Sequence, residues 1–313
     1  MNGNEKQATP EIKARLEEFM KLNGLTLKRL GARVGKSEAF VSRYFSETPV
    51  GDLEEFERAV LDMLASSDRK RTWAEIYFET EAVMMCNMVF DIIRESADIG
   101  LVHGPAGIGK TTACERYANA HKTVIHFVAD EGNGHAYGVI AGIWAKIETR
   151  FYDPKKQKRA EFLKEKLTGS ERLIIVDNAQ RLNMSGLRWL FDFHDATGVS
   201  IALVGNPDVL DRMRGNDQMT SRIGFKQDIA EMLDRGGWLD KASDKMVAAM
   251  WPKAASDIGP LARETARKQG HLRTLKKQLR IAIRLCETDA YRGKPGKAFT
   301  EARHLIGADN TED

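Results

Sequence analysis

Eight consecutive residues, 104–111, read Gly-Pro-Ala-Gly-Ile-Gly-Lys-Thr and match the pattern G-x-x-x-x-G-K-T. In this pattern the glycines let backbone N–H groups turn inward around phosphates, Lys110 reaches the β- and γ-phosphates, and the Thr111 hydroxyl coordinates Mg²⁺. An apolar run, 99–102, precedes the loop, and a helix-compatible stretch, 111–120, follows it. The sequence therefore predicts a loop that binds the phosphates of ATP together with Mg²⁺, rather than a chance glycine-rich turn.

We expect the whole loop and the positive N-terminal end of the following helix to face the same anion. Arg273 begins another predicted helix near the C-terminus and is expected to touch the same phosphates in cis, although an ordinary arginine at a helix start is the alternative. The predicted cofactor-binding residues are Gly104, Pro105, Ala106, Gly107, Ile108, Gly109, Lys110, Thr111, Thr112 and Arg273.

An acidic residue, Asp177, ends the apolar run 173–177. A buried parallel strand that ends in this way places a carboxylate beside the Mg²⁺ of the phosphate loop. Asp177 and Thr111 are therefore the predicted metal ligands, and a turn aspartate after a buried strand is the alternative.

The next residue is Asn178, where many ATPases of this kind have a glutamate that polarises the attacking water. An amide can orient a water molecule but cannot accept its proton. We expect ATP to bind and its hydrolysis to be slow, or to depend on another base or on a partner. Gln180 is nearby, but its spacing argues against a direct replacement.

Two more residues are predicted to act at the γ-phosphate. Asn206 follows the apolar run 201–205, and the ligand of a parallel sheet binds at the carboxyl ends of its strands; a turn asparagine before Pro207 is the alternative. Arg222 lies in a basic loop from which a guanidinium can reach a neighbouring subunit, as an arginine finger does, or can simply be solvated. The predicted catalytic residues are Lys110, Asp177, Asn178, Asn206 and Arg222.

Short apolar runs alternate with helix-length amphipathic segments in the middle of the chain. The runs are 99–103, 123–129, 173–177 and 201–205. This alternation predicts an α/β fold in which helices cover both faces of a parallel sheet.

The flanking regions have only helical periodicity, which predicts an all-α N-terminal domain and a C-terminal helical lid. The expected divisions are a helix-turn-helix domain at 1–65, a polar and charged linker at 66–79, an ATPase core at 80–227, and a lid with a basic DNA-binding region at 228–313.

Residues 25–45 have the pattern of a helix-turn-helix. Gly35 suits the turn, and Ser37 can cap a second helix, which predicts that the exposed face of that helix meets the major groove of DNA. A helical module that docks another protein is the alternative. The predicted DNA contacts here are Lys36, Ser37, Ser42 and Arg43.

Two further basic stretches are candidates for DNA contact. A loop after Pro154 carries Lys155, Lys156, Lys158 and Arg159, although a solvated run of charge is the alternative. Near the C-terminus, Lys276, Lys277 and Arg280 share one predicted helix face with Arg273. Such a face suits phosphates without reading base sequence.

Composition sets broad limits on the chain. The net charge of +3 is only mildly basic, so any surface for nucleic acid must be local. The three cysteines are widely separated and have neither metal-site nor disulfide spacing, which fits a reducing compartment. The polar N-terminus has no signal core, and no apolar run approaches the roughly 20 residues that span a bilayer. We therefore expect a soluble, cytoplasmic protein.

Taken in order along the chain, these features resemble the AAA+ ATPases that assist transposases, of the type found in phage Mu. The likeness covers nearly the whole chain, and the order of the parts makes it more specific than the phosphate loop alone. Those parts are the helix-turn-helix, the loop 104–111, Asp177, Gly205-Asn206, Ser221-Arg222-Ile223 and the basic helical end with Leu272-Arg273.

The resemblance implies ATP-dependent, largely non-sequence-specific binding of double-stranded DNA in a bacterial host cell. It also implies a helical filament of this chain, capture and delivery of target DNA, and a transposase partner that promotes hydrolysis and release. Arg222 would act across the subunit interface and Arg273 in cis, while Asn178 departs from the usual glutamate. The alternatives are a DNA-binding regulator that uses ATP as a structural ligand, and a replication-initiation or helicase-loading ATPase.

Overall fold

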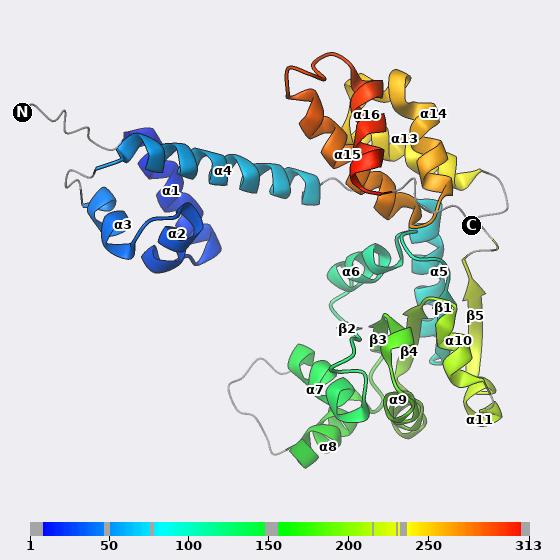
Figure 1. Ribbon diagram of the computed structural model, residues 1–313. Helices are drawn as coiled ribbons and strands as arrows, with labels where there is room; N and C mark the ends of the chain where they lie inside the picture. Colours follow the sequence, from blue (N-terminus) through cyan, green and yellow to red (C-terminus); the bar gives the residue numbers. More distant parts are fainter. Residues whose placement is uncertain are drawn as a thin grey trace, which may run out of the picture. The chain divides into compact units, whose positions relative to one another are not determined.

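The computed structural model divides the chain into two compact units, Met1–Tyr77 and Phe78–Asp313 (Figure 1). No helix within the described parts of the chain is long and apolar enough to cross a membrane. The residues described are 9–46, 51–75, 78–147, 156–214, 216–229, 231 and 237–307.

The first unit is built from helices whose apolar faces close on one core. They are α1 (Pro10–Asn23), α2 (Leu27–Val34), α3 (Glu38–Phe45) and α4 (Leu53–Glu75). Tyr44 and Phe56 are both buried in this core, with ring centroids 4.7 Å apart. At the corner between α2 and α3, Gly35 has φ 68°, and a Cβ on Gly31 would lie 2.5 Å from the Lys36 carbonyl oxygen. The predicted helical pair is therefore present, with glycine at both points that need it.

The predicted linker at 66–79 is helical over most of its length, because α4 continues to Glu75. The segment 66–71 is polar and charged, yet it contains neither glycine nor proline. Lysine and arginine are good helix formers and are well solvated on a helix surface, so polarity alone does not end a helix. This part of the expected domain division is corrected accordingly.

The second unit is organised on a five-stranded parallel sheet with the order β2-β3-β4-β1-β5. The strands are β1 (Ile99–His103), β2 (Val124–Val128), β3 (Leu173–Asp177), β4 (Ser200–Gly205) and β5 (Ile223–Asp228). The three central strands, β1, β3 and β4, are buried along their whole length. That burial is the reason they read as continuous apolar runs, and the predicted α/β fold is confirmed.

Helices cover both faces of this sheet (Figure 1). One face carries α5 (Glu81–Ser96) and α6 (Lys110–Ala120), and the other carries α7 (Ala136–Ile147) and α9 (Met184–Thr197), beside which α8 (Lys156–Leu167) packs. One hydrophobic core lies under α7, α8 and α9 and includes Phe127, Ile174 and Leu203.

The edge strand β5 is absent from the predicted strands, and the domain boundary expected at 227/228 falls inside it. It pairs with β1 alone, and its side chains are partly or fully exposed. Its sequence, Ile-Gly-Phe-Lys-Gln-Asp, is therefore too polar to stand out as a buried run. The short helices α10 (Asp208–Met213) and α11 (Asp217–Thr220) connect β4 to β5.

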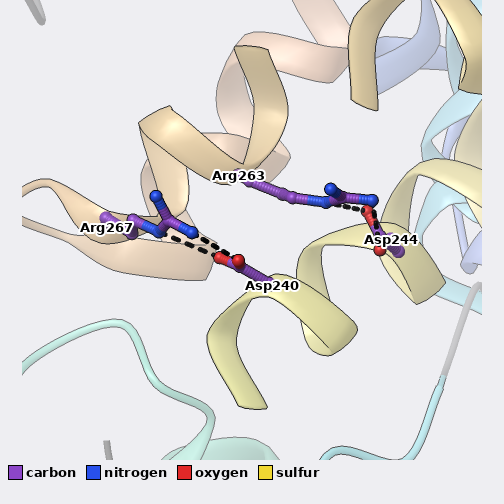
Figure 2. A network of polar contacts seen from close by, with 4 residues as sticks. All are labelled: Asp240, Asp244, Arg263 and Arg267. Carbon is purple, nitrogen blue, oxygen red and sulfur yellow. Dashed lines mark hydrogen bonds and ion pairs between the residues drawn. The ribbon is translucent and has the colours of Figure 1, made fainter. Parts of the chain in front are cut away.

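The C-terminal lid consists of α13 (Trp238–Met250), α14 (Ala255–Arg267), α15 (His271–Cys286) and α16 (Pro295–Leu305). Figure 2 shows two arginine–aspartate pairs that join α13 to α14. Arg263 donates from Nε and Nη2 to the two oxygens of Asp244, at 2.8 and 2.9 Å, and Arg267 grips Asp240 in the same way. Such exposed pairs contribute roughly 1 kcal/mol or less, but their planar forks fix the register of the two helices.

A buried amide connects three helices of the lid, α14, α15 and α16. Gln278 of α15 is fully buried; it accepts a hydrogen bond from Thr265 of α14 at 3.0 Å and donates one to the Phe299 carbonyl of α16 at 2.8 Å. A buried amide that lost these partners would be costly. The two arginine–aspartate pairs and this amide together hold the four helices of the lid in one packed unit.

Candidate functional site

The loop 104–111 lies between β1 and α6, as predicted. Gly107 and Gly109 have φ values of 89° and 112°, which suit glycine, and the Gly104 N–H donates to the Gly205 carbonyl at the end of β4, at 3.3 Å. The N-terminal end of α6 points into the loop. The geometry is that of a backbone cradle for an anion.

Lys110 is the first residue of α6 and is only 8% exposed. Its ammonium donates to the carbonyl oxygens of Gly104 and Pro105, both at 2.7 Å, and is thereby held inside the loop. Burial, with a smaller contribution from the nearby Arg273, lowers the pKa of Lys110 to about 8. A buried cation with only carbonyl partners is a favourable position for a phosphate oxygen.

Asp177 is the last residue of β3 and is 1% exposed. Its Oδ1 accepts the Asn178 N–H at 2.8 Å, whereas its Oδ2 is buried without a hydrogen-bond partner among the described residues. Thr111 and Thr112 are exposed on the first turn of α6. An unpaired buried carboxylate oxygen and a hydroxyl are hard oxygen donors, so the residues predicted to hold Mg²⁺ fit that ion chemically.

Asn178 follows Asp177 in the left-handed region, with φ 57°, and begins the short 3₁₀ helix η1 (Ala179–Arg181). Within η1, Gln180 uses its Oε1 to accept the backbone N–H of Asn206 at 3.2 Å. A Cβ on Gly205 would lie 2.7 Å from the same oxygen. Gln180 therefore holds the end of β4 in place. No sequence signal marked this contact, because it joins residues 26 positions apart.

The start of α15 lies against the phosphate loop. A Cβ on Gly107 would be 2.0 Å from the Gly270 carbonyl oxygen and 3.2 Å from the Arg273 Cβ. Arg273 itself is exposed. The structure thus brings together the phosphate loop and the lid residue that was predicted to touch the same phosphates in cis.

Arg222 lies at the opposite end of the strands from the phosphate loop. It precedes Ile223, which is in register with Ile99 at the start of β1, whereas the phosphate loop follows the end of β1. A five-residue strand separates the two by about 15 Å. Arg222 instead contacts α9, with Nη1 2.9 Å from Asp195 Oδ2 and 3.6 Å from Asp192 Oδ1. It cannot reach the phosphate loop of its own chain.

Of the residues predicted to contact DNA in the first unit, Ser42 and Arg43 are exposed on α3, and Ser37 caps that helix by accepting the Phe40 N–H at 3.2 Å. Lys36 differs from the expectation. Its side chain is 18% exposed, and its ammonium lies 3.2 Å from Glu55 and 3.7 Å from Asp52. Its charge is therefore largely neutralised within the unit.

The basic segment after Pro154 is helical from Lys156 onward, because α8 begins there. Lys158 is exposed, but Arg159 donates to the Tyr137 hydroxyl at 3.0 Å and lies 4.8 Å from the centre of the Trp144 ring. Arg159 therefore joins α8 to α7. Lys155 and the side chain of Lys156 lie outside the described residues.

The predicted basic face of α15 is present opposite the buried residues Leu275 and Leu279. Lys277 is exposed, while Lys276 and Arg280 are half-buried. Burial lowers the pKa of Lys276, and the adjacent Arg280 adds to the shift.

Comparisons with known proteins agree with this fold. The AAA domain family matches residues 93–213. The chain is similar to the ATP-dependent target DNA activator B of Escherichia phage Mu, with 24% identity over 285 residues that cover 87% of this chain and 88% of that protein. It is also similar to the Mu-like prophage FluMu DNA transposition protein B of Haemophilus influenzae, with 24% identity over 204 residues, 64% of this chain and 71% of that protein. The predicted resemblance to the phage Mu B protein is confirmed.

Among solved structures, the chain resembles the Aeropyrum pernix ORC1 protein in complex with DNA, with a TM-score of 0.50 and 16% identity over 74% of this chain and 67% of that one. At this identity the likeness concerns the fold alone. Together with the matched family it assigns the second unit the AAA+ ATPase fold, which binds nucleotide at the phosphate loop.

We predict that Gly107→Ala weakens nucleotide binding by about tenfold or more, because overpacking of this kind costs roughly 1–3 kcal/mol. The new methyl group meets the Gly270 carbonyl and forces the lid away from the loop. Titration with a fluorescent ATP analogue measures the change. Gly259→Ala in α14 is the matched control, because a Cβ there meets nothing within 4 Å. Equal affinity in the two variants would contradict the predicted contact between loop and lid.

Proposed function

We propose that this chain is an ATP-dependent DNA-binding AAA+ protein that selects target DNA and activates a transposase. The observation that carries the proposal is the extent of its likeness to the target DNA activator B of phage Mu. That likeness covers 87% of this chain, more than the unit Phe78–Asp313 contains, and therefore extends into the helix-turn-helix unit.

ATP binding is the first part of the proposal. Lys110 exchanges its two carbonyl partners for phosphate oxygens, and the N–H groups of the loop surround the same anion. Thr111 and Asp177 would hold Mg²⁺, which supplies positive charge at the β- and γ-phosphates. Arg273 approaches these phosphates from the lid of the same chain.

Assembly is the second part, and it follows from the position of Arg222. This guanidinium lies at the end of the sheet where the strands begin, whereas ATP is held at the end where they finish. Arg222 therefore acts on ATP held by another copy. To do so it leaves Asp195 and Asp192 for a γ-phosphate, which an arginine can bind through two parallel hydrogen bonds. The bound nucleotide thereby joins successive copies into a filament.

DNA binding is the third part. Assembly repeats the basic face of α15 along the array, so that weak contacts with phosphates add up to firm binding that ignores base sequence. Ser42 and Arg43 on α3 are further contacts that each copy offers.

Hydrolysis of ATP is the fourth part of the proposal. Asn178 orients the attacking water without accepting its proton, so turnover is slow until the transposase promotes it and the protein leaves the DNA. The same residue favours a second candidate function, a DNA-binding regulator that keeps ATP as a structural ligand.

We predict that the chain sediments with double-stranded DNA in ATP and Mg²⁺, but not in ADP or without nucleotide. Lys110→Ala should abolish the ATP-dependent fraction, because it removes the ammonium that meets the phosphates. Lys122→Ala, an exposed lysine in the turn after α6, is the control and should behave as wild type. A wild-type chain that stays a monomer with saturating ATP and DNA would refute the proposed function.

We predict that Arg222→Ala retains ATP affinity in the monomer and loses assembly, because its guanidinium serves a different copy. Analytical ultracentrifugation with ATP and DNA measures assembly, and titration with a labelled nucleotide measures affinity. The matched control is Arg214→Ala, which removes a nearby arginine whose partner, Asp211, is also an aspartate at 3.1 Å. Should the Arg222 variant still form filaments, this arginine is an ordinary surface residue.

We predict that Asn178→Glu raises single-turnover ATP cleavage by about tenfold or more, since a general base contributes roughly 10²–10⁴-fold and the left-handed backbone reduces the gain. Asn178→Gln is the control, because it has the shape of glutamate without the proton acceptor. Equal rates in both variants would mean that the base lies elsewhere. Cleavage that stays at zero in the wild type, with DNA and a transposase present, would favour the regulator.

A further inference from the structure

Three metal-ligating side chains converge between α6 and the sheet, beside the phosphate loop. Cys114 comes from α6, His126 from β2 and Asp177 from the end of β3. The thiol sulfur, an imidazole nitrogen and a carboxylate oxygen all lie within 4.8 Å of one another. Cys114 is fully buried, and the side chains of His126 and Asp177 are 14% and 2% exposed.

Two of these groups present buried polar atoms that lack a hydrogen-bond partner among the described residues. They are Nε2 of His126 and Oδ2 of Asp177. The two atoms are 3.9 Å apart, which is too long for a hydrogen bond. The other oxygen of Asp177 is already used by the Asn178 N–H. Proteins pair almost all of their buried polar atoms, so two orphaned atoms that face each other indicate a missing common partner.

The donor set identifies the chemistry of that partner. A thiolate, an imidazole and a carboxylate are ligands of Zn²⁺ and similar cations, whereas Mg²⁺ and Ca²⁺ prefer oxygen donors only. Zinc bond lengths of about 2.0–2.3 Å place donor atoms about 3.3–3.8 Å apart in a tetrahedron. Small side-chain rotations close the observed separations to that range. One thiolate and one carboxylate also neutralise a dication, which suits a buried position.

We propose that Cys114, His126 and Asp177 form a binding site for a thiophilic divalent cation, of which Zn²⁺ is the best match. The Cys114 thiol releases its proton to solvent as the sulfur–metal bond forms, and the fourth position of the tetrahedron is left to water. Three protein ligands with one open position are typical of zinc sites that can exchange a ligand.

The site shares Asp177 with the phosphate loop, and this consequence rests on the proposed function. Zn²⁺ at Asp177 withdraws the carboxylate that Mg²⁺ needs beside Thr111. Zinc therefore inhibits ATP cleavage through Cys114 and His126, residues that have no other part in the nucleotide site.

Cobalt titration of the full chain, reduced and treated with chelator, tests the site without nucleotide. Co²⁺ bound by a thiolate gives a charge-transfer absorption band, which Zn²⁺ should then remove. We expect the wild type to bind one ion per chain. Cys114→Ala should lose the band, and His126→Gln should bind Co²⁺ about 100-fold more weakly or worse, since the loss of even an outer-sphere partner costs 10–100-fold. Cys286→Ala, which removes a cysteine of α15, should keep the wild-type band.

Circular dichroism melting of each variant without metal shows whether it is folded. The absence of a charge-transfer band in the wild type, or its survival in folded Cys114→Ala, overturns the proposal. A second measurement compares the Zn²⁺ concentration that halves the rate of ATP cleavage. We expect this concentration to be at least tenfold higher for His126→Gln than for the wild type. If cobalt binds but zinc inhibits both proteins equally, the shared role of Asp177 is wrong. If the chain never binds ATP, the proposed function fails while the cobalt result still decides the metal site.

Discussion

All five strands of the sheet run in the same direction, and this one constraint decides which side chains can meet. The phosphate loop and Asn206 follow the carboxyl ends of β1 and β4, and Asp177 is the last residue of β3, so they gather at one end of the sheet although they are far apart in the sequence. Arg222 precedes a strand and lies at the other end. The sheet thus both assembles the nucleotide site and excludes from it the one arginine that resembles a catalytic finger.

The lid adds a second constraint, because its helices behave as one body. The α13–α14 arginine forks and the buried Gln278 leave little freedom within it. Its contact with the phosphate loop is made through Gly107 and the start of α15. The same helix carries the basic face with Lys276, Lys277 and Arg280. One helix, α15, therefore connects the phosphate loop to the basic face.

Much of this was predictable, because the signals are local. Each of three features can be recognised within ten residues of sequence. They are the glycines of the phosphate loop, the apolar central strands and the acid at the end of β3. The strand β5 was missed because an edge strand needs little apolar character. Lys36 and Arg159 were predicted to contact DNA, but their partners, Glu55 for one and Trp144 for the other, come from different helices. Contacts of that kind depend on tertiary packing, which no short pattern records.

The separation of Arg222 from the phosphate loop has a consequence for symmetry. Two copies related by a twofold axis present the same patch to each other, whereas the proposed contact joins two different parts of the chain, Arg222 of one copy and the phosphate loop of the next. If Arg222 acts on the nucleotide of the next copy, as proposed, successive copies stack head to tail. Such a stack does not close on itself unless its rotation returns to the start. The two ends of such a stack would differ, one with a bound nucleotide that lacks an arginine partner and the other with an arginine that lacks a nucleotide. The proposed array would therefore have a direction along the duplex.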